Sequence, residues 1–259
     1  MKRLRNKIQA GDVSFHRGPS LGALCVVFVS LFILSLAVTG VMTGGAHFPT
    51  PYEPVALAQD YFSRYADVIR IAAFLQFGAA IPLGIFTATV TSRLKFLGMR
   101  AAGADIAHFG GFAASVFLAL SAGAGWVLTQ PGMATEASAL RALQLLGFVT
   151  GGPGHVVTLG LLLAGVSVPS AFTKLIPRWL VWLGLIVAAI CELSALSLVF
   201  PMAGIILPLG RFPAFIWLIG VGFTMPKSRG RRETEAGSAN EWRGIRRTHP
   251  RPATDSHKY

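Results

Sequence analysis

Charged residues are scarce in this chain, which excludes an ordinary soluble domain. Asp, Glu, Lys and Arg make up 13% of the 259 residues, whereas 53% are hydrophobic, and the mean hydropathy is +0.59. In soluble globular domains about a quarter of the residues are charged. We therefore expect the chain to reside in a membrane.

Cysteines and several catalytic motifs are also lacking. The only two cysteines, Cys25 and Cys191, lie in separate apolar stretches, so they can form neither a disulfide framework nor a cysteine-based metal site. The patterns H-E-x-x-H, G-x-x-x-x-G-K-[ST] and C-x-x-C are absent, which leaves zincin, P-loop and thioredoxin-type chemistry without support. We predict no cofactor.

Long apolar stretches, in contrast, are abundant. A helix needs about 20 mostly apolar residues to cross the hydrocarbon core of a bilayer, and six stretches satisfy this requirement. We predict spans at 20–43, 68–91, 103–128, 143–167, 179–200 and 204–225. The fold class is therefore an all-α, polytopic transmembrane helical bundle (20–225), flanked by a basic N-terminal segment (1–19) and a basic, disordered tail (226–259).

The last of these spans is interrupted by Pro201, Pro208 and Pro213. Proline removes a backbone donor and disfavours a helix interior. An alternative is therefore that the helix begins near Phe212 and that the preceding residues form an irregular segment. The topology is the same in both cases.

Lys and Arg are distributed unequally between the two ends of the spans. Of the 23 Lys and Arg residues, 19 lie in the N-terminal segment, the 2–3 and 4–5 connections and the tail. Because cytoplasmic loops collect positive charge, we predict that both termini are cytoplasmic. The basic face would attract anionic lipids, at about 1 kcal/mol per residue near the surface. We predict no nucleic-acid partner, because no folded module is present and the tail, with Trp242 as its lone tryptophan, offers no aromatic stacking platform.

The connection between the first two spans is the one sizeable external loop. Its second half, PVALAQDYFSRYADVI, predicts an amphipathic helix on the membrane surface, with Tyr61, Phe62 and Tyr65 at headgroup level. The alternative is a lid over a substrate site.

Four charged residues fall inside the predicted spans: Arg70, Asp105, Glu192 and Arg211. Such residues are costly in a bilayer and are functional-site hypotheses. At about 1.5 Å per residue, Glu192 and Arg211 both lie roughly 11 Å below the outer surface, and Gln76 reaches a similar depth. We therefore predict an outward-facing ligand pocket formed by Gln76, Glu192 and Arg211, with Arg70 near its rim. The alternatives are a purely structural ion pair, or an Arg211 that lies at the headgroups.

A second polar group is predicted nearer the cytoplasmic side. Asp105 and His108 share one helix face, and His155 lies on the fourth span. These residue types can bind metal or relay a proton, but a depth difference of roughly 10 Å between the two histidines argues against a tight site. The alternative is that Asp105 caps its helix and that His155 bonds a carbonyl freed by a kink at Pro153.

The six-span layout, the loop FPTPYEPVALAQDYFSRYADVIRIAAFLQFGAAIPLGI and the closing run GRFPAFIWLIGVGFTMPKSR resemble a group of small bacterial membrane proteins catalogued as a domain of unknown function. The resemblance covers about residues 20–228. It implies a location in the bacterial cytoplasmic membrane and carries over no activity.

These observations support three functional hypotheses. The leading one is a non-enzymatic bundle that binds or passes a small or lipid-like ligand through the outer pocket. The second is a membrane-embedded enzyme or a redox or metal protein that uses the Asp105, His108 and His155 region. The third is a structural or partner-binding subunit, for which the small residues of the third span are relevant. The small residues of the third span more directly predict a packing seam with the fourth span, and the sequence predicts no particular oligomeric state.

Overall fold

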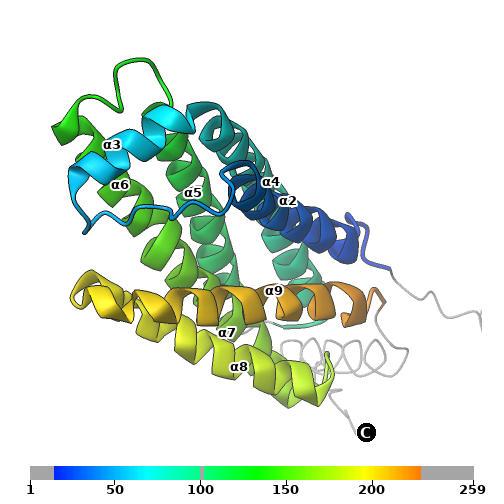
Figure 1. Ribbon diagram of the computed structural model, residues 1–259. Helices are drawn as coiled ribbons and strands as arrows, with labels where there is room; N and C mark the ends of the chain where they lie inside the picture. Colours follow the sequence, from blue (N-terminus) through cyan, green and yellow to red (C-terminus); the bar gives the residue numbers. More distant parts are fainter. Residues whose placement is uncertain (1–14, 100–101, 229–259) are drawn as a thin grey trace, which may run out of the picture. The chain divides into compact units, whose positions relative to one another are not determined.

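The computed structural model describes residues 15–99 and 102–228 (Figure 1). Residues Gly18–Met225 form one compact unit. Outside it, the described residues on either side form an antiparallel bridge between Phe15 and Ser228, in which the His16 N–H donates to the Lys227 carbonyl at 2.9 Å. Most of the predicted N-terminal segment (1–19) and tail (226–259) lies outside the described residues.

The compact unit contains six helices that are long and apolar enough to cross a membrane, so the predicted fold class is confirmed. The chain is a multi-pass membrane protein. The first three spanning helices are α2 (Leu21–Met42), α4 (Ala66–Phe96) and α5 (Gly103–Leu128). The fourth consists of α6 (Ala137–Val149), a π-helical turn η1 (Thr150–Gly154) and α7 (His155–Thr173). The last two are α8 (Arg178–Leu193) with a 3-10 turn η2 (Ser194–Leu198), and a 3-10 turn η3 (Pro201–Ile205) with α9 (Ile206–Thr224).

Several helices extend past the predicted apolar stretches because helices end at backbone signals rather than at the first charged residue. The second span was predicted to end at residue 91, but α4 continues to Phe96. Gly98 then adopts φ +95°, and the N–H groups of Gly98 and Met99 bond the carbonyls of Lys95 and Leu94. This is the Schellman pattern of a helix C-terminus.

The start of the last span is the second difference. The irregular segment is confined to the 3-10 turn Pro201–Ile205, and α9 begins at Ile206 rather than near Phe212. Pro208 is tolerated because the first N–H groups of a helix have no partner within it. Pro213 lies inside the helix.

The start of the first span has a specific cap. The run Gly18–Gly22 reads G-P-S-L-G and fits the G-x-S-x-G pattern of a nucleophile elbow, which requires a strand before the serine and a helix after it. Here Ser20 is the N-cap of α2, and its hydroxyl accepts from the Ala23 N–H at 3.4 Å. The serine therefore serves to begin a spanning helix.

The spanning helices pack in the order α2, α4, α5, α7, α8 and α9, and α9 returns to α2. α8 and α9 form a hairpin that crosses α7, while α6 packs on α5 near the short helix α3 (Val55–Arg64) (Figure 1). We call the end of the unit that carries α3 the α3 end. The site described below lies at this end, between α2 and α6.

Small residues bring α5 and α7 into backbone contact. A Cβ atom on Gly110 would lie 2.6 Å from the Thr158 carbonyl oxygen, and one on Gly165 would lie 2.5 Å from the Ala107 nitrogen. Such close approach increases van der Waals contact between helices in a bilayer, where burial of apolar surface does not drive association.

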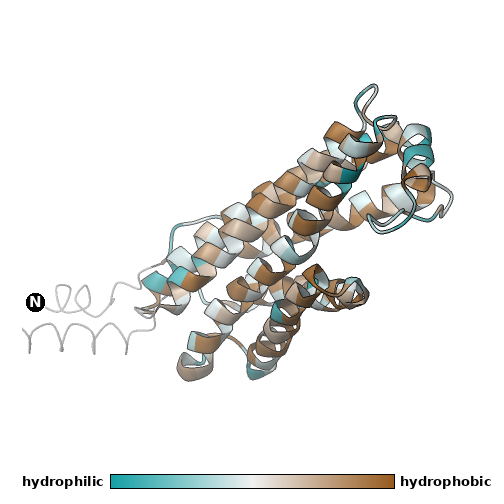
Figure 2. Ribbon diagram, turned by 90° about the vertical axis from the view of Figure 1, so that its left-hand side faces the viewer, coloured by the Kyte–Doolittle hydropathy of each residue, from teal (hydrophilic) through white to brown (hydrophobic). Residues whose placement is uncertain are grey.

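The outward surface of the helices is apolar. Hydrophilic residues gather mainly in the connections and at the helix ends, and the helices themselves are largely hydrophobic (Figure 2). Large side chains such as Phe74, Trp182 and Ile216 are more than half exposed. An apolar surface of this extent is unfavourable in water and favourable against lipid.

Candidate ligand-binding cavity

A cavity of about 650 Å³ opens inside the α3 end of the unit. Its walls come from α2, α4, α5, α6, η1 and the first half of α9, and segments of the loop between α2 and α3 cover it. Small residues on four of these helices leave the space: Gly40, Ala72, Ala73, Ala122, Gly125 and Gly147. The remaining wall is mainly apolar, with Phe32, Leu36, Leu118 and Phe148 among its larger side chains.

Arg211 is the charged residue among those that line the cavity. One Nη2 N–H donates to the Gly151 carbonyl, across 60 residues of sequence. The guanidinium carbon lies 5.4 Å from the centroid of the Phe32 ring, within the range of a cation–π contact. The Nε atom is buried and has no hydrogen-bond partner. Arg211 therefore places an incompletely bonded positive charge in the wall of an apolar cavity.

The kink in the fourth span explains why the Gly151 carbonyl is available to Arg211. In an α-helix this carbonyl would accept from the N–H of His155. Here the His155 N–H is directed to the carbonyls of Thr150 and Gly152 instead. Gly152 has a non-helical ψ of −109°, and Pro153 supplies no backbone donor. The π-helical turn thus leaves a carbonyl free where the cavity meets α9.

Two glutamine side chains add polar groups to the wall. Gln76, on α4, lines the cavity, and its side chain makes no hydrogen bond to the described residues. Gln144, on α6, is 7% exposed and donates to the Pro49 carbonyl at 3.3 Å. Its Oε1 atom is buried without a partner. The cavity thus has unused polar atoms on two sides in addition to Arg211.

The loop of residues 43–54, here called the strap, joins α2 to α3 and crosses the α3 end of the unit (Figure 1). Arg141 on α6 holds it, donating to the carbonyls of Pro51 and Glu53. The Tyr52 ring also packs edge-on against Phe148, with 5.7 Å between centroids. Because Phe48, Pro49 and Pro51 line the cavity, the strap forms part of its wall.

A hydrogen bond between two residues of the strap, His47 and Glu53, also stabilises its conformation. His47 Nε2 lies 3.0 Å from a carboxylate oxygen of Glu53. This hydrogen bond lowers the pKa of the Glu53 carboxyl below its ordinary value. Hydrogen bonding to the charged form favours that form, so Glu53 carries its negative charge at neutral pH.

Arg141→Ala is expected to loosen the strap and leave the bundle intact. The variant removes two hydrogen bonds from a charged donor, each worth about 1.5–3 kcal/mol, whereas the α2, α4 and α5 contacts remain. Limited proteolysis should cleave residues 43–54 faster, with an unchanged thermal unfolding temperature for the bundle. Arg64→Ala, which removes an exposed arginine from α3, is the matched control. Equal cleavage rates in both variants would show that Arg141 does not hold the strap.

The short helix α3 differs from the sequence-based interpretation. The amphipathic helix is present, but Tyr61 and Phe62 are 4% and 2% exposed rather than turned toward lipid headgroups. They pack with Ile69, Leu128 and Leu140, and both line the cavity. Hydrophobic burial against α5 and α6 is available to these rings because the α5–α6 connection lies beside α3. This packing favours the alternative of a cover over the site.

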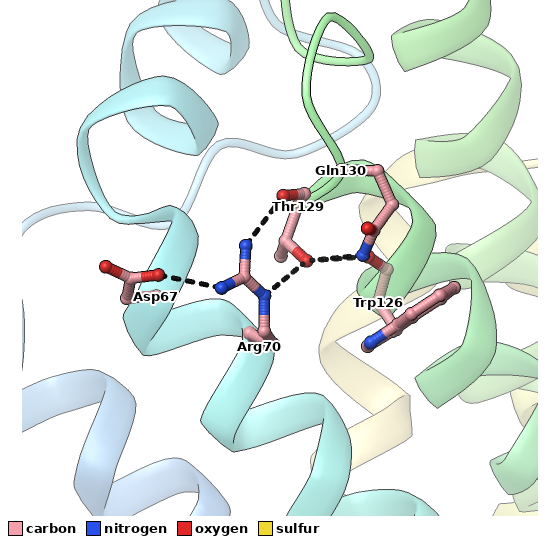
Figure 3. Close-up of polar contacts among 5 residues, drawn as sticks. All are labelled: Asp67, Arg70, Trp126, Thr129 and Gln130. Atoms are coloured by element: carbon pink, nitrogen blue, oxygen red, sulfur yellow. Dashed lines mark hydrogen bonds and ion pairs between the residues drawn. The ribbon is translucent and has the colours of Figure 1, made fainter.

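Arg70 lies outside the cavity lining, on α4 near the α5 terminus (Figure 3). Its Nη1 donates to Asp67 at 2.9 Å, and its Nη2 donates to the Thr129 carbonyl at 3.0 Å. Thr129 follows the last residue of α5, so a cation here complements the negative end of that helix dipole. These contacts join two helix ends and indicate a structural role.

Glu192 also lies outside the cavity lining. Its side chain is exposed on α8, and a Cβ on Gly160 of α7 would lie 3.3 Å from its Oε1. The ion pairs of the described residues do not include one between Glu192 and Arg211. Of the four predicted pocket residues, the structure brings Gln76 and Arg211 to one cavity and leaves Arg70 and Glu192 elsewhere.

The second predicted group is separated into individual contacts. Asp105 pairs with Lys95 at 2.7 Å. His108 Nδ1 lies 3.5 Å from the Thr91 hydroxyl. The buried His155 bonds the Ala114 carbonyl of α5 at 2.9 Å through Nδ1, rather than a carbonyl freed by the kink. Within residues 15–99 and 102–228, no three His, Cys, Asp or Glu side chains come together in a way that could hold a metal ion.

Comparison with family models, curated proteins and solved structures found no significant match to this chain. The resemblance to six-span bacterial membrane proteins is therefore not supported by these comparisons. The inference of function rests on the geometry of the cavity.

Proposed function

We propose that this protein is a non-enzymatic helical bundle that binds or passes a lipid-like small molecule in the cavity between α2, α4, α5, α6 and α9. The observation that carries the proposal is the cavity itself, about 650 Å³ with mainly apolar walls. This volume is within the range of about 300–1,000 Å³ that is usual for small-molecule sites.

The position of the cavity supports a ligand that comes from the bilayer. The helices around it present apolar outer surfaces to lipid, and small residues on α2, α4, α5 and α6 leave the interior open. Packed protein interiors contain few voids larger than a water molecule. An apolar space of this size in a membrane protein is suited to a hydrocarbon chain.

Two glycines on α5 allow a sharp test of this proposal. Gly125 lines the cavity, and the nearest atom to an added Cβ would be the Ala73 Cβ at 3.9 Å. Gly123, two residues earlier, has open space around it and lines a separate apolar pocket with Phe74 and Phe77. Leucine at either position adds the same volume to the same helix, but only Gly125→Leu narrows the cavity.

The test uses purified protein in phosphatidylcholine nanodiscs and a photoactivatable medium-chain fatty alcohol. We expect saturable crosslinking to cavity residues in the original protein and in Gly123→Leu. In Gly125→Leu the apparent affinity should fall by about tenfold or more, a loss of about 1.4 kcal/mol. Absence of saturable crosslinking, or equal affinity in the two variants, would refute the proposal.

We also propose that the protein lies in a bacterial cytoplasmic membrane with both termini in the cytoplasm, where its basic face contacts anionic lipids. The unequal distribution of Lys and Arg supports this orientation. It places the α3 end and the cavity on the outer side. Alkaline phosphatase fused after Tyr259 should then be inactive, and an active fusion would reverse the assignment.

A further inference from the structure

Arg211 combines a permanent charge with an incomplete set of partners. A guanidinium remains protonated in proteins and carries five N–H donors. In the described part of the chain, one of these donors bonds a protein acceptor, the Gly151 carbonyl. The face of Phe32 contributes a cation–π contact, but no carboxylate pairs with the charge.

Such an arrangement is costly unless a further partner is bound. Arg211 is partly buried, and a charge that loses hydration without gaining a counter-ion is energetically unfavourable. The Nε atom of Arg211 is buried without a hydrogen bond, and the side chain forms part of the cavity wall. Its unused donors are therefore at the position where a bound molecule would supply acceptors.

The shape of the cavity limits what that molecule can be. Arg211 and Leu207 contribute the α9 part of the lining, and Phe32 and Leu36 contribute part of the α2 wall. The strap, α3, α4, α5 and α6 contribute most of the remaining wall, which is mainly apolar. A ligand that satisfies the guanidinium and fills the rest of the space therefore has one acidic group and one hydrocarbon chain.

We propose that the ligand is an anionic single-chain amphiphile, whose carboxylate or phosphate group binds Arg211 while its chain occupies the apolar part of the cavity. This inference rests on the proposed function, because it assigns the chemical class of the molecule bound in the same cavity. Planar guanidinium groups bind carboxylate and phosphate oxygens with two parallel hydrogen bonds.

A purely structural role of Arg211 makes a different prediction. If Arg211 only ties α9 to the π-helical turn, an acid and a neutral molecule of the same length bind equally well. Arg211→Gln separates the two roles, because glutamine removes the charge and keeps an amide donor. Arg70→Gln is the matched control: it removes an arginine of the same α3 end that does not line the cavity.

The experiment compares a photoactivatable medium-chain fatty acid and an alkyl phosphate with the alcohol of the same chain length. Phosphatidylcholine nanodiscs carry the original protein, Arg211→Gln and Arg70→Gln. We expect both anionic probes to bind about 10- to 100-fold more tightly than the alcohol in the original protein and in Arg70→Gln, the range for a hydrogen bond to a charged group. In Arg211→Gln the ratio should fall to about one.

Each other outcome contradicts one of the two proposals. Equal binding of acid and alcohol by the original protein, or a preference for the acid that persists in Arg211→Gln, would overturn the anionic class and leave the cavity function standing. Displacement of the fatty acid by inorganic phosphate as effectively as by the alkyl phosphate would identify a small-anion site instead. Failure of all probes to crosslink saturably would refute the cavity function itself. The comparison of acid with alcohol decides the question in the original protein even if Arg211→Gln does not fold.

Discussion

Replacing Gly110 with alanine is expected to lower the free energy of unfolding by about 1–3 kcal/mol, the range for overpacking a tight contact. A Cβ at this position would lie 2.5 Å from the Leu161 Cβ, 2.6 Å from the Thr158 carbonyl oxygen and 2.7 Å from the Leu162 nitrogen. Two of these three atoms belong to the backbone of α7, so no side-chain rotation relieves the clash. The α5 and α7 helices must instead move apart.

Gly123→Ala is the matched control for this prediction because it lies on the same helix. A Cβ there would meet nothing within 4 Å, and alanine has a helix propensity about 1 kcal/mol more favourable than glycine. Thermal or denaturant unfolding in nanodiscs should show a destabilised Gly110→Ala and an unchanged or stabilised Gly123→Ala. If the two variants unfold alike, the close contact of α5 with α7 is not a determinant of stability.

Trp217→Ala is expected to have the larger effect, a loss of about 3–5 kcal/mol in the free energy of unfolding. Trp217 is 0% exposed, and its Nε1 donates to the Leu180 carbonyl of α8 at 3.0 Å. Its removal leaves a cavity between α8 and α9 and deprives a buried carbonyl of a donor. In a bilayer the loss comes from packing and hydrogen bonding, because the unfolded helix also keeps its side chains in an apolar solvent.

Trp182→Ala measures how much of that effect is general to tryptophan. Trp182 lies on α8, and 62% of its surface is exposed, so its replacement exchanges contacts with lipid for other contacts with lipid. We expect a change within about 0.5 kcal/mol, as for most surface substitutions. The unfolding free energies of both variants can be measured in one denaturant series. A similar loss in both would contradict the assignment of Trp217 as a core residue of the α8–α9 contact.

The spans were predictable from sequence to the extent that they depend on composition. The third span was predicted at 103–128, and α5 has those bounds. The fourth was predicted at 143–167, but the helix runs from Ala137 to Thr173. Hydropathy indicates which residues are favourable in the hydrocarbon core of a bilayer, whereas the positions of helix ends depend on local backbone geometry. The helix α7 ends just before Lys174, which has a positive φ of 55°. Positive φ is uncommon for residues other than glycine, so a lysine does not predict the end of a helix.

The candidate site was only partly predictable, and the reason is geometric. Counting residues along a helix estimates depth, and it placed Gln76, Glu192 and Arg211 at one level. Depth says nothing about rotation around the helix axis, which the packing of neighbouring helices sets. Gln76 and Arg211 face the cavity, whereas Glu192 is exposed on α8.

The strap shows a second limit of the sequence. Its prolines Pro49, Pro51 and Pro54 predict a connection without regular structure, and this connection is present between α2 and α3. Its place over the cavity depends on Arg141, about 90 residues further along the chain. No local pattern in the sequence relates two such segments.

The class of protein follows from composition and from the length of the apolar stretches, because polar groups are costly in hydrocarbon and a span needs about 20 apolar residues. Which polar residues share a cavity depends on how the helices pack, and composition does not predict it. The contact between Arg211 and the Gly151 carbonyl requires a π-helical turn on one span and a particular rotation of another. Both follow from the packing of six helices against each other, and packing is a property of the folded chain rather than of any segment.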